Sequence, residues 1–242
     1  MTTATPQRLY LLPFGITILP RPTTPLVMSS GCYLVQLSDG RNILIDTGLP
    51  AEYTHAVGTP PTENEKSMFQ NLADLNLTPA DIDTVICTHF DIDHAGNNDA
   101  FPHAELIVQR SHYELARSGH ERFADGRAHW DHPDLRYRLI DGDTELLPGL
   151  TLLETSGHTL GHQSVLLHLP NTGNILLAID AVSFGSQFTI DRTASPVEDL
   201  EQVLASTRKL IDIAEREKVA LVIFHHDGKQ WQTLKTAPAF YD

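Results

Sequence analysis

The sequence predicts an α/β fold in which two β-sheets are flanked by helices. Its apolar runs predict elements in the order strands, helix, strand, helix, strands, helix, strand. This order fits two sheets with helices on the outside better than the regular alternation that builds a single parallel sheet. Several predicted strands end directly before a histidine or an aspartate, so polar groups are expected to meet at one edge of the fold.

The composition is that of a folded and acidic protein. Of its 242 residues, 41% are hydrophobic and 20% are charged, which is typical of a globular chain. The formal net charge of −14 and the lack of a basic stripe argue against nucleic acid or an anionic membrane and favour a small-molecule partner. We expect a cytoplasmic protein, because the chain shows no signal-peptide pattern and Cys32 and Cys87 form no disulfide framework. Both a monomer and a homodimer remain open.

The first half of the chain predicts a hairpin followed by alternating helices and strands. In the hairpin, two β-rich runs flank a turn at Asp39-Gly40. In the first helix, Thr62 and Glu65 form the predicted capping box. A proline-rich stretch over residues 13–25 is expected either to arch over the site or to act as a stiff connector. The predicted elements are a hairpin over 31–48, a helix over 62–77, a strand over 83–87, a strand over 103–109 and a helix over 110–118.

The second half is predicted to consist mostly of strands, with one long helix. Residues 119–138 show no regular pattern, and so long an irregular segment predicts a functional lid or a mobile loop. The long helix is predicted to begin with Ser195 as its N-cap and Pro196 in its first turn, and to end near Glu217. The predicted strands cover residues 144–147, 150–155, 162–169, 174–180 and 219–224.

The stretch THFDIDHAG, residues 88–96, places four metal-binding side chains within six residues. Imidazole suits zinc and iron, whereas carboxylates suit harder ions and can bridge two of them. A polar loop with a helix-capping aspartate is the weaker alternative, because it leaves the ligands at other strand ends unexplained. The candidate ligands are His89, Asp91, Asp93, His94, His158, Asp180 and either His225 or His226.

Five segments of the chain occur in an order that resembles one known family. They are GCYLV…ILIDTGLP, DIDTVICTHFDIDHAGN, TSGHTLGHQSVLL, AIDAV and FHHD. Together they resemble the metallo-β-lactamase-fold hydrolases, and among these the N-acyl homoserine lactonases. The resemblance covers nearly the whole chain. It implies one hydrolase domain over residues 1–242, folded as an αββα sandwich of two mixed β-sheets.

The resemblance implies a site for two divalent metal ions, with zinc preferred and iron or manganese as alternatives beside Asp91. It also implies that a metal-bridging hydroxide opens a lactone ring, a quorum-quenching activity, while Asp93 passes a proton to the leaving alkoxide. Asp46 matches the structural aspartate of the family motif. The implied ligands are His89, Asp91 and His158 for the first ion, Asp93, His94 and His226 for the second, and Asp180 as the bridge.

The chain departs from the lactonase pattern at two positions. The family pattern HxHxDH reads HxDxDH here, with Asp91 at the second ligand position. Asp91 either binds the first ion, or is too short to reach it, or marks a site that has lost activity. We favour the first outcome, because the other six ligands are intact. The lactonases carry a substrate-holding tyrosine shortly after the bridging aspartate, and Ser183 stands at that place, which assigns this catalytic contact to Ser183.

The remaining candidates concern the substrate and the other histidines. Phe184, Trp130 and His225 are the predicted substrate-binding residues, although aromatic residues near a site are as often plain core. His162 is expected to support the site, and the residues expected on the surface or in the lid are His112, His120, His129 and His132. Other members of this fold act on a phosphodiester, a thioester or another ester, or serve redox chemistry with an attached flavin domain, for which this chain has no spare length. The hydrolases among them, and a non-enzymatic binding module, remain alternatives.

Overall fold

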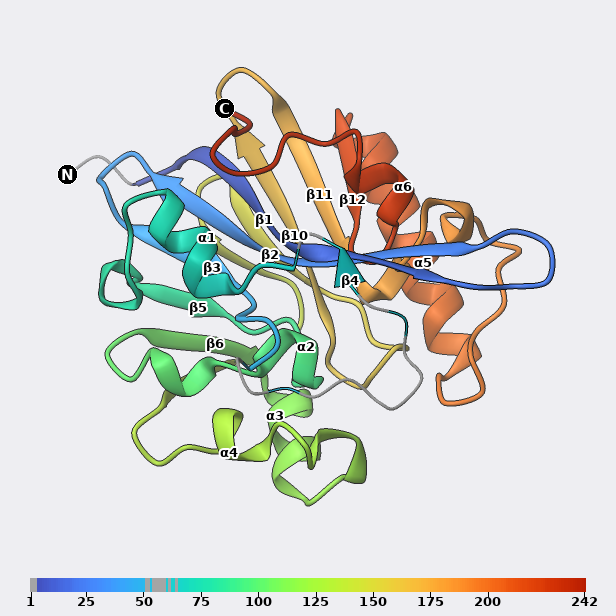
Figure 1. Cartoon of the computed structure of the whole chain (residues 1–242), viewed down its shortest axis with the longest axis horizontal. Helices are drawn as coiled ribbons and strands as arrows, with labels where there is room; N and C mark the ends of the chain where they lie inside the picture. The colour runs from blue at the N-terminus through green and yellow to red at the C-terminus, as the bar shows by residue number, and fades with distance from the viewer. Residues whose placement is uncertain (1–3, 51–52, 54–59, 61, 64) are drawn as a thin grey trace.

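Two β-sheets pack face to face, and helices cover their outer faces (Figure 1). The computed structural model describes residues 4–50, 53, 60, 62–63 and 65–242. The inner faces of the two sheets form a shared core, in which Leu11 and Tyr33 of one sheet belong to the same cluster as Val165 and Leu177 of the other. The predicted αββα sandwich is therefore confirmed.

The first sheet has seven strands in the order β4-β1-β2-β3-β5-β6-β7. It is mixed, because β4, β1, β2 and β3 pair antiparallel whereas β3, β5, β6 and β7 pair parallel. Side chains alternate between its faces, so that Leu9 points to the shared core and Tyr10 to the outer face. Its strands are β1 (Pro6–Leu19), β2 (Leu26–Leu37), β3 (Asn42–Ile45), β4 (Thr62–Glu63), β5 (Thr84–Ile86), β6 (Glu105–Gln109) and β7 (Arg136–Ile140).

The second sheet has five strands in the order β12-β11-β10-β9-β8. Strands β8 to β11 pair antiparallel, and β12 joins the edge parallel to β11, so this sheet is mixed as well. Its strands are β8 (Thr144–Leu147), β9 (Leu150–Glu154), β10 (Gln163–Leu169), β11 (Gly173–Ile179) and β12 (Leu221–Phe224). All five were predicted from their apolar runs, because such runs between turn residues are the strongest local signal for a buried strand.

Helices lie on the outside of both sheets (Figure 1). Met68 and Leu72 pack on the outer face of the first sheet, and Leu210 and Ile213 pack on that of the second. The α-helices are α1 (Met68–Asp74), α2 (Ile92–Ala95), α3 (Arg110–Arg117), α4 (Arg127–Trp130), α5 (Leu200–Arg216) and α6 (Gly228–Trp231). The 3₁₀ helices are η1 (Pro79–Asp81), η2 (Asn98–Ala100), η3 (Glu121–Phe123), η4 (Asp180–Val182) and η5 (Gly185–Gln187). Among the described helices, none combines the length and the apolar character needed to cross a bilayer.

The predicted starts of two helices are wrong. Helix α1 begins after Ser67, which forms a capping box with Gln70, whereas Thr62 belongs to strand β4. Helix α5 begins after Asp199, whose side chain accepts a hydrogen bond from the backbone of Gln202, and not after Ser195. In both cases a second cap-forming residue follows the predicted one within two turns, and tertiary packing decides which one is used.

The N-terminal strand β1 was not predicted. Pro13 and Gly15 interrupt its apolar pattern, and the register with β2 shifts between these two residues. A bulge accommodates a proline that a regular ladder would exclude, so the strand continues past it. The stretch over residues 13–25 is therefore the distal part of a long β-hairpin rather than a stiff connector.

The segment over residues 119–138 is a packed part of the fold rather than an irregular lid. It contains η3, α4 and the start of β7. Phe123 and Trp130 are each 1% exposed, and the Trp130 ring stacks on Phe90 at 5.1 Å between centroids. The indole of Trp130 lies in the core and donates to the carbonyl of Phe123, which favours the core alternative for this residue over the substrate pocket.

Candidate metal centre

Side chains from four parts of the chain meet where the two sheets approach each other. Strand β5 leads to His89, and the short helix α2 carries Asp93 and His94. Strand β11 ends directly before Asp180, and β12 ends before the pair His225-His226. The loop after β9 supplies His158. The polar groups therefore emerge from buried strands that fix their positions.

The first donor set consists of His89, Asp91, His158 and Asp180. Oδ2 of Asp91 lies 3.3 Å from Nε2 of His89 and 3.2 Å from Nε2 of His158. Oδ2 of Asp180 lies 3.7 Å from His89 Nε2 and 3.5 Å from His158 Nε2. Four ligands placed about 2.1 Å from a tetrahedral ion are separated by about 3.4 Å, so these spacings fit one ion.

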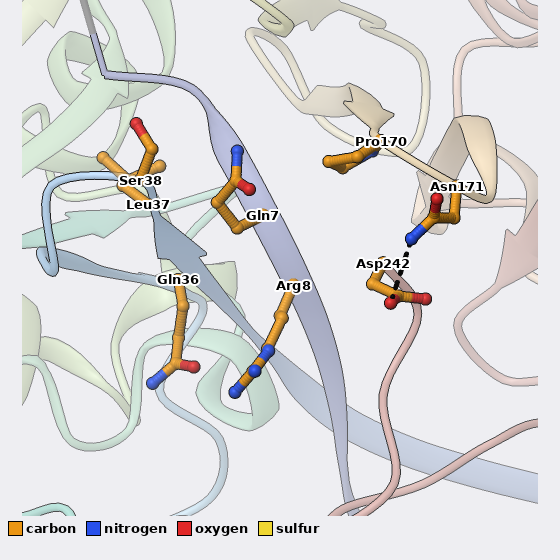
Figure 2. Close-up of a pocket in the computed structure, with 8 residues that line it drawn as sticks. All are labelled: Gln7, Arg8, Gln36, Leu37, Ser38, Pro170, Asn171 and Asp242. Carbon is orange, nitrogen blue, oxygen red and sulfur yellow. Dashed lines mark hydrogen bonds between the residues drawn. The ribbon is translucent and has the colours of Figure 1, made fainter.

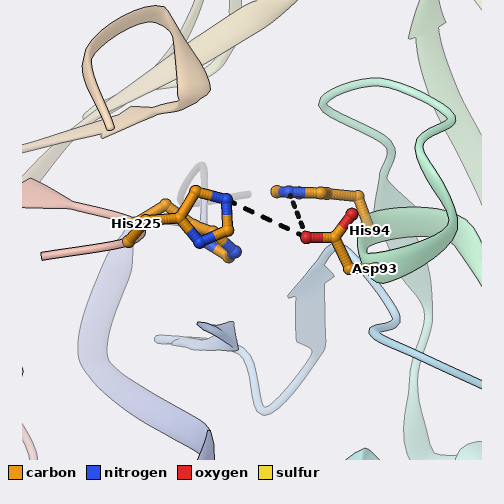
Figure 3. A group of neighbouring side chains, drawn as sticks. Asp93, His94 and His225 are labelled. Carbon is orange, nitrogen blue, oxygen red and sulfur yellow. Dashed lines mark ion pairs between the residues drawn. The ribbon is translucent and has the colours of Figure 1, made fainter. Parts of the chain in front are cut away.

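The second donor set consists of Asp93, His94, His226 and the same Asp180. The Asp180 carboxylate lies 3.2 Å from His94 Nε2 through Oδ2 and 3.3 Å from His226 Nε2 through Oδ1. Oδ2 of Asp93 lies 3.7 Å from His94 Nε2 and 3.9 Å from His226 Nε2. Figure 3 shows the Asp93 carboxylate facing the His94 ring. Asp180 thus belongs to both sets, as a bridging ligand would.

The hydrogen bonding of these side chains supports a metal site. His89 Nε2, His94 Nε2 and Asp180 Oδ1 are buried without a hydrogen-bond partner among the described residues. Buried polar atoms are paired in more than about nine cases of ten, so several orphans aimed at one region call for a bound group. Imidazole nitrogens and carboxylate oxygens are ligands for divalent ions, and the residues present therefore fit them.

The charge states of His89 and Asp180 suit metal binding directly. Burial, together with the positive field of His94, keeps the pKa of His89 well below its ordinary value, so its ring is neutral and its Nε2 lone pair is available. Burial alone would raise the pKa of Asp180, but His226 and His94 hold it well below the usual range. Asp180 is therefore an ionised carboxylate, as a bridge between two cations requires. Burial lowers the pKa of His94, His158 and His226, but the neighbouring carboxylates raise it above the ordinary value, so a metal ion must displace a proton from these rings.

Asp46 orients one of the ligands. Its Oδ2 accepts a hydrogen bond from Nδ1 of His94 at 2.8 Å, and the backbone and hydroxyl of Thr88 both donate to the same carboxylate at 2.8 Å. Because Nδ1 carries this proton, Nε2 is the nitrogen of His94 that faces the second donor set and would bind an ion there. This geometry agrees with the structural role predicted for Asp46.

Two further ligands are oriented in the same way. Nδ1 of His226 lies 2.9 Å from the carbonyl of Ser29, and Nδ1 of His158 lies 3.0 Å from Oε1 of Glu198. Burial would raise the pKa of Glu198, but hydrogen bonds from His158 and from the backbone of Ser195 lower it to about 2. No sequence signal marks Glu198, because it lies 40 residues from His158 in a loop without a motif.

Arg122 is the second functional residue that sequence reasoning missed. Its Nε and Nη2 donate to Oδ1 and Oδ2 of Asp91 at 2.7 and 2.6 Å, and its Nη1 donates to the carbonyl of His158 at 2.8 Å. Burial would raise the pKa of Asp91, but the Arg122 guanidinium keeps it far below the usual range. A single arginine in a segment without periodicity looks like an ordinary surface cation, so the sequence could not single it out.

The backbone is strained directly before the bridging aspartate. Ile179 has a φ of +52°, although it is β-branched and fully buried. Such a residue rarely adopts this conformation, which costs about 1–3 kcal/mol and is held in place by the surrounding structure. Here the turn ends β11 and brings Asp180 to the site, where the backbone N–H of Asp180 donates to Nε2 of His162 at 3.2 Å. His162 supports the site as expected.

The structure corrects one other histidine prediction. His112 is fully buried rather than on the surface or in a lid. Its Nε2 accepts from the backbone of Phe90, and its Nδ1 contacts the carbonyl of Leu160. His225 is also fully buried, with its ring 4.4 Å from that of His94, and its substrate contact stays a prediction. His225 belongs to the group of possible ligands around Asp93, but His226 is the one that contacts Asp180.

The other predicted residues lie near the site or on the surface. Ser183 follows η4, and its carbonyl accepts from the backbone of His226 at 3.1 Å. Phe184 is half-buried at the start of η5. His120 and His132 are exposed, and His129 pairs with Asp99 at 2.9 Å. The structure therefore keeps Ser183 and Phe184 as neighbours of the donor sets, and their roles stay predictions.

An apolar pocket of about 660 Å³ adjoins the second donor set. Ser29 and Ser30 line it and also contact Nδ1 of His226, which connects the pocket to the ligands. Its apolar lining residues come mainly from the β1–β2 hairpin and the chain around β3 and α1, and include Phe14, Leu19, Met28, Leu49, Pro50 and Met68.

A second pocket of about 480 Å³ lies away from the site (Figure 2). Pro170 and Asn171 line it in the turn before β11, whereas Asp180 follows the opposite end of that strand. At about 3.3 Å per residue the two are roughly 20 Å apart. None of the residues that line this pocket belongs to a donor set.

Known proteins share both the sequence and the fold of this chain. Residues 27–226 match the model of the metallo-beta-lactamase superfamily. An N-acyl homoserine lactonase of Bacillus cereus is 32% identical over 255 residues, which cover 98% of this chain and 99% of the relative. The N-acyl homoserine lactonase AttM of Rhizobium radiobacter is 35% identical over 198 residues, which cover 75% of this chain and 72% of the relative.

Solved structures agree over the same length. An N-acyl homoserine lactone hydrolase with the product N-hexanoyl-L-homoserine bound at its catalytic metal center superposes with a TM-score of 0.84 at 30% identity, covering 98% of this chain and 100% of that one. A quorum-quenching N-acyl homoserine lactone lactonase superposes with a TM-score of 0.86 at 31% identity, covering 99% and 100%. The chain is thus a hydrolase, and it belongs to the metallo-β-lactamase superfamily.

Proposed function

We propose that this hydrolase uses two divalent metal ions to open the lactone ring of N-acyl homoserine lactones. The observation that carries the proposal is the pair of donor sets that share Asp180, each with spacings of 3.2–3.9 Å between ligand atoms. Relatives of full length are N-acyl homoserine lactonases, which supports the same substrate class here. The histidine-rich donors favour zinc, with iron or manganese as alternatives at the set that contains Asp91.

Asp93 is the residue best placed to move a proton. Its side chain is 28% exposed, whereas that of His226 is 14% exposed and those of His94 and Asp180 are at most 3% exposed, so Asp93 is the most accessible member of the second set. Bound ions would supply a nucleophile at neutral pH and polarise the substrate carbonyl. Asp93 can then take up a proton and deliver it to the ring oxygen that leaves, while Ser183 is proposed to contact the carbonyl oxygen.

The apolar pocket beside His226 fits the acyl chain. An acyl homoserine lactone has a polar ring and a flexible hydrocarbon tail, and burial of each methylene group is worth about 0.8 kcal/mol. A pocket of about 660 Å³ next to the ligands offers a place for that tail while the ring stays at the metal ions. Phe184 remains a candidate for contact with the ring or the start of the chain, because it follows η4 next to Asp180.

A pH-stat assay on N-acyl homoserine lactones of graded chain length tests the proposal. We expect acid release with each lactone, loss of the rate after chelation, and recovery when zinc is added back. Asp93→Asn should lower kcat by about 10²- to 10⁴-fold, the usual contribution of a proton-transfer residue. Asp134→Asn makes the same chemical change at a side chain that is 73% exposed, and should leave the rate unchanged.

Other outcomes of the same assay decide against the proposal. If the metal-loaded enzyme hydrolyses a phosphodiester or a thioester but no lactone, the substrate class is wrong although the metal site stands. If the folded protein binds no divalent metal, the two-metal site itself is wrong.

A further inference from the structure

We propose that Arg122 competes with the metal ion of the first donor set, so that the two sites fill in order and the second set fills first. The inference rests on the two-metal site of the proposed function, but not on the lactone as substrate. It concerns a residue of the chain whose guanidinium already contacts two of the four donors in the first set.

The contacts of Arg122 converge on the atoms that would hold the first ion. Its Nη2 lies 2.6 Å from Oδ2 of Asp91 and also 2.6 Å from Nε2 of His158. These two donors are 3.2 Å from each other. One nitrogen of the guanidinium therefore lies against both ligand atoms, and does so from a side chain that is only 22% exposed.

Only one of the two contacts is compatible with a bound ion. A carboxylate oxygen has two lone pairs, so Oδ2 of Asp91 can accept a hydrogen bond from Arg122 and bind a metal ion at the same time. An imidazole binds a metal ion through one unprotonated nitrogen, and Nδ1 of His158 is already committed to Glu198 at 3.0 Å. Nε2 of His158 can therefore face either Arg122, which now lies 2.6 Å from it, or a metal ion, but not both.

The second donor set has no such competitor in the part of the chain that the structure describes. The ion pairs that its described residues form across the set join only histidines and aspartates. Nε2 of His94 is without a hydrogen-bond partner among the described residues, whereas Nε2 of His158 contacts a cation. A first ion can therefore enter the second set without displacing an arginine from a ligand atom.

Arg122 can release His158 and still hold Asp91. Its Nε donates separately to Oδ1 of Asp91 at 2.7 Å, so a rotation of the guanidinium end can free Nε2 of His158. The guanidinium and the carboxylate then remain a pair of zero net charge, like the neutral imidazole that the lactonase pattern has at this position. This accounts for a carboxylate at position 91 without an added negative charge at the first ion.

A calorimetric titration of the metal-free enzyme with zinc tests the inference without any measurement of activity. The wild-type chain should bind one ion tightly and a second more weakly. Arg122→Met removes the competing donor, and should tighten the second step by roughly tenfold to a hundredfold, the worth of a hydrogen bond to a charged group. The first step should change little. Cobalt absorption should show the same two steps.

Arg127→Met is the matched control, because it removes an arginine five residues away whose side chain is 53% exposed. It should leave both steps unchanged. Should Arg122→Met fail to fold, Arg122→Lys replaces it, since a single amine cannot hold both Asp91 oxygens and His158 as the guanidinium does. The lysine variant should also bind the second ion more tightly than wild type.

Two results would overturn the inference. One is that the wild-type chain binds both ions with equal, high affinity. The other is that removal of Arg122 weakens the second step, which would make the arginine a support for Asp91 rather than a competitor. Ordered filling without lactone turnover supports the inference, and counts only against the proposed substrate.

Discussion

Nδ1 of His94 donates to Oδ2 of Asp46 across 2.8 Å, and this bond decides which nitrogen of the ring faces the metal centre. Asp46→Asn keeps the shape of the side chain but removes the charged acceptor. We expect zinc affinity of the second set to fall by about tenfold to a hundredfold, as is usual when the partner of a ligand is removed. Calorimetric titration measures this. Asp39→Asn, in the exposed turn before β3, is the control, and equal affinities for both variants would contradict the expectation.

Glu198 has the corresponding role for His158. Its Oε1 lies 3.0 Å from Nδ1 of His158 in a partly buried position. Glu198→Gln keeps an acceptor oxygen, so it should lower kcat/KM by less than about tenfold, whereas Glu198→Ala should lower it by about tenfold to a hundredfold. Activity across a zinc concentration series measures both variants. If the two variants are equally impaired, the carboxylate acts through its charge and not by orienting the imidazole.

The strands of this fold were predictable from local sequence, and the helix starts were not. An apolar run such as residues 174–180 must be buried, and so short a run between turn residues forms a strand in the core, so its structure follows from its composition. A helix start depends on which of two nearby caps is used, and packing decides this for Ser67 and Asp199. Strand β1 escaped prediction because Pro13 needs a bulge that only pairing with β2 provides.

The candidate ligands were predictable for a related reason. Four of them lie within THFDIDHAG, and the others come within a few residues of the end of a strand, so their order along the chain carries the information. Arg122 and Glu198 have no such pattern, and their importance arises only when the fold brings them to Asp91 and His158. Burial is equally non-local, which is why the sequence leaves Trp130 between a substrate pocket and the core, and the structure favours the core.

The apolar pocket predicts a dependence on acyl-chain length. For the wild-type enzyme, kcat/KM should rise by about fourfold for each methylene that enters the pocket, since each is worth about 0.8 kcal/mol. Met28 is half-buried and lines the pocket, so Met28→Trp should fill it and flatten this rise while short chains are still hydrolysed. Ile190→Trp adds the same group at a residue that is 52% exposed, and should leave the chain-length profile as in wild type. Parallel profiles for Met28→Trp and wild type would place the acyl chain elsewhere.

His112 predicts how stability depends on pH. Burial lowers its pKa from 6.5 to about 4, while its Nε2 accepts from the backbone N–H of Phe90 and its Nδ1 contacts the carbonyl of Leu160. Because the folded pKa lies below the unfolded one, the unfolded chain binds a proton that the folded chain does not between about pH 6.5 and pH 4. The free energy of unfolding should therefore fall by up to about 3 kcal/mol from this residue as the pH drops through that range, and should be unaffected above it.

His112→Gln isolates this contribution, because an amide can also accept from Phe90 and donate to Leu160 but does not titrate. Urea unfolding of the metal-free proteins at pH 7.5 and at lower pH should show that wild type loses stability faster than the variant. The contributions of the other titrating groups cancel when the two free energies of unfolding are subtracted, because both proteins share these groups. His132→Gln, at a side chain that is 39% exposed, should follow wild type. If His112→Gln and wild type lose stability in parallel, His112 is protonated in the folded protein, and its Nε2 cannot be the acceptor that holds the backbone of Phe90 beside His89 and Asp91.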